Sequence, residues 1–171
     1  MNSSPASPPA AQISTSGSGE PYLKFRLDPH TWAVLAMEYA QEVLVLSAQR
    51  ITPMPNMPPA VLGLLNWRSR VLWVVDLAHM LQLQPLEANV QKYNLAIVRV
   101  GELPLALAVQ QVEGVTRLAP DTIQSPIGTV TSGLIPFLQG CILQQQEILL
   151  ALDAEAIVRS PSLNPITAAR L

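Results

Sequence analysis

Apolar and polar residues alternate at the start of the ordered part of the chain. Between residues 22 and 27, Leu23, Phe25 and Leu27 are separated by the basic residues Lys24 and Arg26. This period of two predicts a half-buried β-strand. A turn sequence follows at residues 28–31, and residues 32–38 predict a second strand.

The chain contains an internal repeat, because residues 63–81 align without gaps on residues 140–158. Each copy has a glycine, two apolar residues, a polar turn, an apolar strand and an aspartate that precedes a helical pattern. The aspartates are Asp76 and Asp153. An aspartate in this position can accept a hydrogen bond from an unpaired backbone N–H, so we expect both to be helix N-cap residues.

Many short strands, proline-rich connections and this repeat predict a mainly β fold of two small barrels packed together. We expect few helices: a turn or two after Pro58, one from Asp76 to Leu83, and one from Asp153. The junction between the barrels is expected near residues 84–91, which are polar and contain a proline.

The two ends of the chain differ from the body in composition. Residues 1–20 are nearly all Ser, Pro, Ala, Gly, Gln and Thr. Such a segment buries too little apolar area to offset its ordering entropy, so it is expected to be a disordered tail. The folded body is expected over residues 21–160, and residues 161–171 are expected to be a C-terminal tail.

Composition excludes several classes of protein. The chain has 171 residues, is 49% hydrophobic and only 13% charged, against a usual charged share of about 25%. The net charge is −2, there is no basic run, and aromatic residues make up 5%, so nucleic-acid binding is not expected. No apolar run approaches the roughly 20 residues that span a bilayer, and no secretory signal is visible. With a single cysteine and hence no internal disulfide, the chain is expected to be cytoplasmic, without membrane insertion.

Reactive side chains are few and scattered. His30, His79 and Cys141 do not have the spacing of metal ligands. Glu38 and Glu42 are four residues apart, but without an evident partner they are better interpreted as solvated charges. Phosphate-binding and nucleophile motifs are missing as well. We therefore expect no metal, no cofactor and no catalytic residue.

The central segment, residues 51–77, reads ITPMPNMPPAVLGLLNWRSRVLWVVDL. It resembles the signature of CheW-like domains, which have a proline-containing loop, the pattern Gly-φ-φ-Asn-φ-Arg-Gly with φ apolar, and an apolar strand that ends in Asp-Leu. The similarity extends over roughly residues 22–159. Trp67 stands where the family usually has leucine, and Ser69 where it has glycine. Since serine adopts positive φ less readily than glycine, the turn at residues 68–70 is expected to differ in shape.

The resemblance implies two five-stranded, SH3-like barrels around a hydrophobic core, with the first strand and the C-terminal segment completing the opposite barrel. It also implies a non-enzymatic adaptor. CheW proteins bind the regulatory domain of a CheA-type histidine kinase and the cytoplasmic tip of a methyl-accepting chemoreceptor. An adaptor of the same fold in pilus-based twitching motility or phototaxis is an alternative. A small-ligand-binding barrel would need a polar cavity, whereas the inward positions look uniformly aliphatic.

Five residues are candidates for partner contacts. Arg68 matches the family arginine and is expected to reach the receptor tip, where its planar donors can bind carboxylates or carbonyls; otherwise it is a solvated turn residue. Glu42 is a second receptor-facing candidate, or a free surface glutamate. Trp67 could anchor an interface, although a strand would place it opposite Arg68 and in the core. Met54 and Met57 belong to a loop that is either a partner surface or a lid over the core.

Overall fold

The computed structural model describes residues 19–125 and 130–167. Residues 1–18 of the expected N-terminal tail lie outside the described residues, and the first strand begins at Glu20. The strands are β1 (Glu20–Asp28), β2 (Thr31–Ala36), β3 (Ala40–Ser47), β4 (Ile51–Thr52), β5 (Val61–Trp67), β6 (Arg70–Asp76), β7 (Lys92–Val100), β8 (Leu103–Val109), β9 (Gln111–Leu118), β10 (Leu138–Gln144) and β11 (Glu147–Leu152). The helices are α1 (Leu77–Met80), α2 (Ala154–Val158) and α3 (Asn164–Thr167), with short 3₁₀ turns η1 (Ala48–Arg50), η2 (Pro120–Thr122), η3 (Ile135–Phe137) and η4 (Pro161–Leu163).

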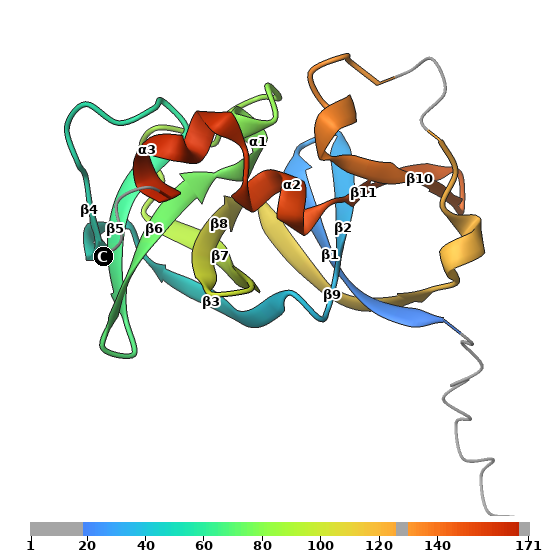
Figure 1. The fold of residues 1–171 in the computed structure, drawn as a ribbon, viewed down its shortest axis with the longest axis horizontal. Helices are drawn as coiled ribbons and strands as arrows, with labels where there is room; N and C mark the ends of the chain where they lie inside the picture. Colours follow the sequence, from blue (N-terminus) through green and yellow to red (C-terminus); the bar gives the residue numbers. More distant parts are fainter. Residues whose placement is uncertain (1–18, 126–129, 168–171) are drawn as a thin grey trace, which may run out of the picture.

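The strands form two curled sheets that lie side by side (Figure 1). Barrel A is the five-stranded sheet in the order β10-β11-β2-β1-β9, and barrel B is the six-stranded sheet in the order β3-β7-β8-β6-β5-β4. The sixth strand of barrel B is the two-residue β4. This architecture confirms the predicted mainly β fold of two SH3-like barrels with few short helices.

The two halves of the chain exchange strands. β1 and β2 pair with strands of the second half in barrel A, whereas β3 leaves them to pair with β7 in barrel B. After β11 of barrel A, helix α2 contacts β7 of barrel B. The first strand and the C-terminal segment thus join opposite halves of the chain, and neither barrel can be built from one half alone.

The structure also contains the repeat that the sequence predicts. The β5–β6 hairpin is followed by α1 as the β10–β11 hairpin is followed by α2. A bulge precedes Gly63 in one copy and Gly140 in the other. Both hairpins turn on two residues with positive φ, the pattern of a type I′ turn, which suits the twist of the strands.

An aspartate begins the helix in each copy. The Asp76 carboxylate accepts a hydrogen bond from the His79 amide at 3.1 Å, and Asp153 accepts one from Ala156 at 3.1 Å. The second oxygen of Asp76 also accepts from the amide of Leu86 at 2.9 Å. Asp76 therefore caps α1 and holds Leu86, in the stretch 84–91 where the junction was expected.

Apolar side chains pack in three clusters. One fills the space shared by the two barrels, one lies inside barrel B and one inside barrel A. The largest fully buried side chains of the shared core are Phe25, Leu27, Leu35, Leu77, Leu81, Leu107 and Leu152. Because both sheets contribute to this shared core, its burial holds the barrels together.

Several expected boundaries were wrong. The second strand ends at Ala36, because residues 37–39 turn the chain towards barrel B. Instead of a helix, residues after Pro58 make a single turn closed by the Val61 amide, since the chain enters the bulged start of β5 directly. Helix α1 stops at Met80, before the positive φ of Gln82.

The C-terminal boundary also needs correction. Residues 161–167, expected to belong to a tail, form η4 and α3. Leu163 and Ile166 are buried in the shared core. The packed fold therefore continues through these elements, and residues 168–171 lie outside the described residues.

Replacement of Gly140 by alanine tests the tight packing at the start of the second repeat. A Cβ atom at Gly140 would lie 2.4 Å from the Gln124 carbonyl oxygen, which accepts a hydrogen bond from the Cys141 amide, while the Gln124 amide donates one to the Cys141 carbonyl. We expect Gly140→Ala to lower the free energy of unfolding by about 1–3 kcal/mol in urea titrations, the usual cost of overpacking. Gly133→Ala is the control, because its Cβ would meet only the mobile end of the Gln82 side chain. A Gly140→Ala protein as stable as this control would contradict the packing.

Replacement of Ser69 by glycine tests the strain in the β5–β6 turn. Ser69 has φ 63° and follows Arg68 at φ 47°, a region that costs residues with a Cβ roughly 1–2 kcal/mol. Glycine removes this cost in the folded protein, but it also raises the conformational entropy of the unfolded chain, which offsets part of the gain in stability. We therefore expect Ser69→Gly to raise the free energy of unfolding by about 0.5–1 kcal/mol in the same titrations. A decrease would show that the serine is not strained.

Candidate functional site

Arg68 and Glu42, the two residues singled out as receptor-facing, form an ion pair. The Arg68 Nη2 atom lies 3.0 Å from Glu42 Oε2. Arg68 is on the turn between β5 and β6, and Glu42 is on β3, at the other edge of the sheet. The pair therefore joins the two edges where barrel B closes, a place we call the barrel B seam.

The Arg68 guanidinium is available to a partner. Its side chain is 70% exposed, and its carbon Cζ lies 5.0 Å from the centroid of the Trp67 ring. An exposed ion pair contributes only about 0–1 kcal/mol to stability. The geometry thus orients the guanidinium, with its remaining donors towards solvent, more than it stabilises the barrel.

Trp67 lies under Arg68 and packs partly against the interior of barrel B. The two side chains do not take opposite faces of a strand, because Arg68 lies beyond the end of β5 in a left-handed conformation. The ring therefore packs in the core, as one of its two expected roles requires, and it also supports the arginine through a cation–π contact.

The outer face of β3 adds apolar surface next to Glu42. Leu44 and Leu46 pack towards the interior of barrel B, while Val43 and Val45 are exposed. Sequence reasoning missed these valines. The sequence did contain a sign of them, because residues 43–46 are all apolar and β3 is therefore apolar on both faces. This pattern is expected for a strand that covers a core on one side and a partner on the other.

The structure separates the two loop methionines. Met57 packs against the shared core, as the lid interpretation expects. Met54 is exposed and could meet a partner. The lid interpretation therefore fits Met57, and a partner contact of Met54 stays a prediction.

A second apolar surface lies on barrel A. Leu143 and Ile148 are directly opposite each other on the β10–β11 hairpin. Their side chains remain 73% and 50% exposed. Sequence reasoning missed this pair, although the repeat places Leu143 at the position of the polar Asn66. A leucine that replaces a polar residue at an exposed position is typical of a contact surface.

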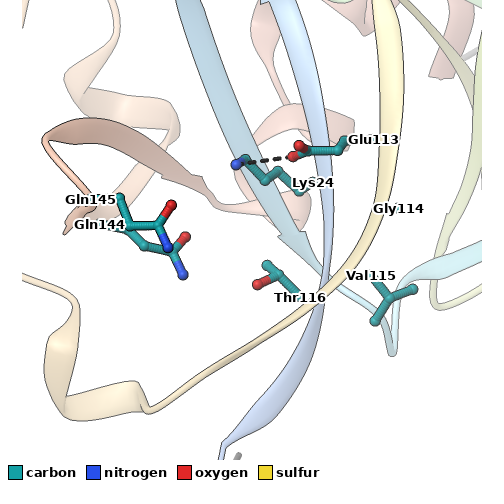
Figure 2. Close-up of a pocket in the computed structure, with 7 residues that line it drawn as sticks. All are labelled: Lys24, Glu113, Gly114, Val115, Thr116, Gln144 and Gln145. Carbon is teal, nitrogen blue, oxygen red and sulfur yellow. Dashed lines mark ion pairs between the residues drawn. The ribbon is translucent and has the colours of Figure 1, made fainter. Parts of the chain in front are cut away.

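Barrel A also has a polar pocket of about 250 Å³ between β9 and the β10–β11 turn (Figure 2). Lys24 lines it and forms ion pairs with Glu113 at 2.9 Å and Glu147 at 3.6 Å. The Trp32 ring lies within 4.9 Å of the Lys24 ammonium and 4.4 Å of the Arg26 guanidinium. The expectation of uniformly aliphatic inward positions was therefore wrong for barrel A, where Lys24 and Arg26 lie two residues apart on β1 and hence on the same face of the sheet.

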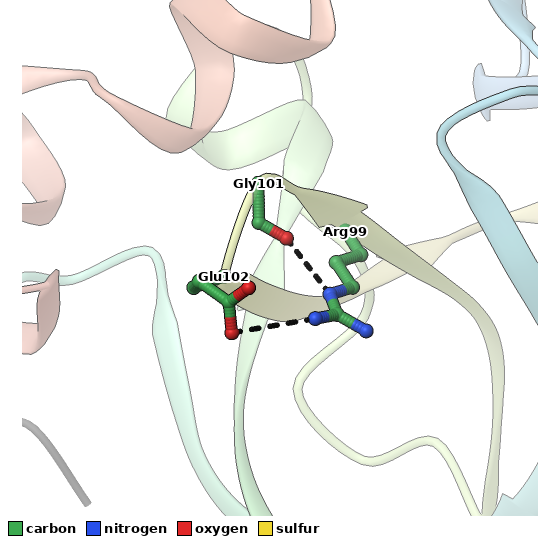
Figure 3. Close-up of polar contacts among 3 residues, drawn as sticks. All are labelled: Arg99, Gly101 and Glu102. Carbon is green, nitrogen blue, oxygen red and sulfur yellow. Dashed lines mark hydrogen bonds and ion pairs between the residues drawn. The ribbon is translucent and has the colours of Figure 1, made fainter.

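Other reactive groups have local roles. Arg99 donates a hydrogen bond to the Gly101 carbonyl and pairs with Glu102 at 3.4 Å, which ties the β7–β8 turn to its own strand (Figure 3). Burial raises the pKa of the Cys141 thiol, so the reactive thiolate is disfavoured at neutral pH.

Residues 19–125 and 130–167 contain no group of three side chains placed to hold a metal ion. Over the same residues, no helix is long and apolar enough to cross a membrane.

Comparison with known proteins agrees with the double-barrel fold. The chain is 22% identical over 127 residues to the chemotaxis protein CheW of Treponema pallidum, which covers 71% of this chain and 74% of the relative. The crystal structure of the scaffolding protein TtCheW from Thermoanaerobacter tengcongensis superposes with a TM-score of 0.72 at 19% identity, covering 84% of this chain and 95% of that one. Residues 21–162 match the CheW-like domain. The chain therefore belongs to the family of CheW-like domains.

Proposed function

We propose that this chain is a non-enzymatic adaptor that couples a methyl-accepting chemoreceptor to a CheA-type histidine kinase. The observation that carries the proposal is the exposed Arg68 guanidinium, held at the barrel B seam by Glu42 and Trp67. Arg68 also matches the arginine of the family signature. Membership of the CheW-like family supports a role as a chemotaxis adaptor.

Barrel B is the proposed receptor side. The Arg68 fork can bind carboxylates and backbone carbonyls on the receptor tip, and charge-assisted hydrogen bonds of this kind are the stronger ones. Val43 and Val45, exposed on the outer face of β3, offer further apolar area on the strand that carries Glu42. A polar anchor with an apolar surround is the usual composition of a protein interface.

Barrel A is the proposed kinase side. Leu143 and Ile148 form an exposed apolar pair at the end of the β10–β11 hairpin. Burial of such a side chain contributes about 1.5–3 kcal/mol, enough for the pair to dominate a contact. Because this pair and Arg68 lie on different barrels, one adaptor could hold both partners at the same time.

Substitution of Arg68 tests the receptor side. We expect Arg68→Ala to weaken binding to a receptor-tip fragment from the same organism at least about tenfold, as for a typical interface anchor. Binding to the kinase regulatory domain should not change in the same calorimetric titrations. Arg50→Ala, which removes an exposed arginine from η1, is the matched control.

The outcome also separates the related pathways. An adaptor in twitching motility or phototaxis would bind the receptor tip of that pathway in preference to a chemotaxis receptor. Absence of binding to every kinase regulatory domain and receptor tip of the organism would contradict the proposed function. The fold would remain as described.

Substitution of the apolar pair tests the kinase side. We expect the double variant Leu143→Ser with Ile148→Ser to weaken kinase binding at least about tenfold, because both side chains would lose their burial in the complex. Receptor binding should be unchanged. Val115→Ser, at an exposed valine on β9 of the same barrel, is the control. Equal losses for the control and the double variant would argue against a specific contact at the hairpin.

A further inference from the structure

The two barrels close differently at equivalent places. In barrel B, the ion pair between Arg68 and Glu42 spans the seam. In barrel A, the corresponding edges are β9 and the β10–β11 hairpin, and the pocket of about 250 Å³ lies between them. We call this place the barrel A seam (Figure 2).

The internal repeat explains why the barrel A seam is open. On the hairpin turn of barrel A, Gln145 takes the position that Arg68 has in the other copy. The two residues have nearly the same backbone conformation, with φ of 48° at Gln145 and 47° at Arg68. On the edge strands, the fourth residue before the buried Leu46 is Glu42, whereas the fourth before the buried Leu118 is Gly114. Both members of the ion pair are thus replaced by residues that leave the seam unfilled.

No atom fills the space next to Gly114 where a side chain would lie. A Cβ atom built on this glycine would have no other atom within 4 Å, so the side of β9 that faces the hairpin is unoccupied. The side-chain amides of Gln144 and Gln145 line the opposite wall. These amides supply hydrogen-bond acceptors as well as donors.

Two carboxylates lie on the solvent side of the pocket. One ammonium, that of Lys24, is shared by the carboxylates of Glu113 and Glu147. The lysine side chain is only 15% exposed, while both glutamates are half-exposed. With Arg26, which packs on the same Trp32 ring as Lys24, the four charges balance, but the two carboxylates lie on the solvent side of the buried ammonium. An incoming anion would meet these carboxylates, and the lysine donors are already engaged.

We propose that the barrel A seam binds the guanidinium group of an arginine from a partner protein. The molecule contains the template for this contact, because Arg68 fills the equivalent seam of barrel B by binding Glu42. Guanidinium has five donors in a planar fork, which can engage Glu113 on one wall and the glutamine carbonyls on the other. The site adjoins the proposed kinase surface, because Gln144 follows Leu143 on the β10–β11 hairpin, but the inference does not depend on that surface or on the receptor surface.

Nuclear magnetic resonance of the full ¹⁵N-labelled chain tests the proposal. The probe is the peptide acetyl-Gly-Gly-Arg-Gly-Gly-amide, with a peptide in which uncharged citrulline replaces arginine as the control, and free L-arginine as a third ligand. We expect saturable shifts at the amides of Gly114 and Gln145, with at least about tenfold weaker binding of the citrulline peptide because it lacks the charge. Equal binding of the two peptides, no binding, or binding of free arginine alone would overturn the proposal.

Two variants locate the site. Glu113→Gln should weaken binding of the arginine peptide about tenfold, because it removes a charged acceptor. Gln145→Arg should also abolish it, because the new guanidinium occupies the seam on a backbone that Arg68 already adopts in the other copy. Glu102→Gln, at an exposed glutamate of the β7–β8 turn (Figure 3), should change nothing. Undiminished binding by Gln145→Arg, in a protein that unfolds at its usual temperature, would overturn the assignment.

Discussion

Burial of apolar area between the two barrels is the interaction on which the rest of the structure depends. Phe25 from β1 and Leu107 from β8 are fully buried in this shared core, although their strands belong to different barrels. Since β1 and β2 pair with strands of the second half, and β3 with β7, neither half can bury its apolar faces alone. The shared core thereby sets the positions of surfaces that lie on separate barrels.

The repeat allows the same backbone to present different chemistry on each barrel. Each copy has a bulge, a left-handed two-residue turn and an aspartate-capped helix. In barrel B the turn carries Arg68, which binds Glu42 and closes the seam. In barrel A the turn carries Gln145, and the exposed apolar pair of Leu143 and Ile148 lies beside it. The two barrels therefore differ most in the side chains at a few turn and edge positions.

The sequence predicted features that depend on local patterns. The repeat indicated both hairpins, and the family signature indicated a turn at Arg68. Closure of the sheets into barrels could not be predicted from the sequence, because it brings together edge strands that are distant in the chain. The pairing of Arg68 with Glu42 and the position of Lys24 at one end of barrel A both follow from that closure. The prediction of a helix after Pro58 was wrong because strand pairing also joins distant residues. The pairing of β5 with β6 outweighs the local helix propensity.

Sedimentation-velocity analysis of the full chain with the kinase regulatory domain and a receptor-tip fragment from the same organism tests the central claim, that one adaptor bridges two partners. We expect a single ternary species that contains all three proteins, because the proposed contacts lie on different barrels. Two binary complexes that exclude each other would contradict it, since the partners would then compete for one surface.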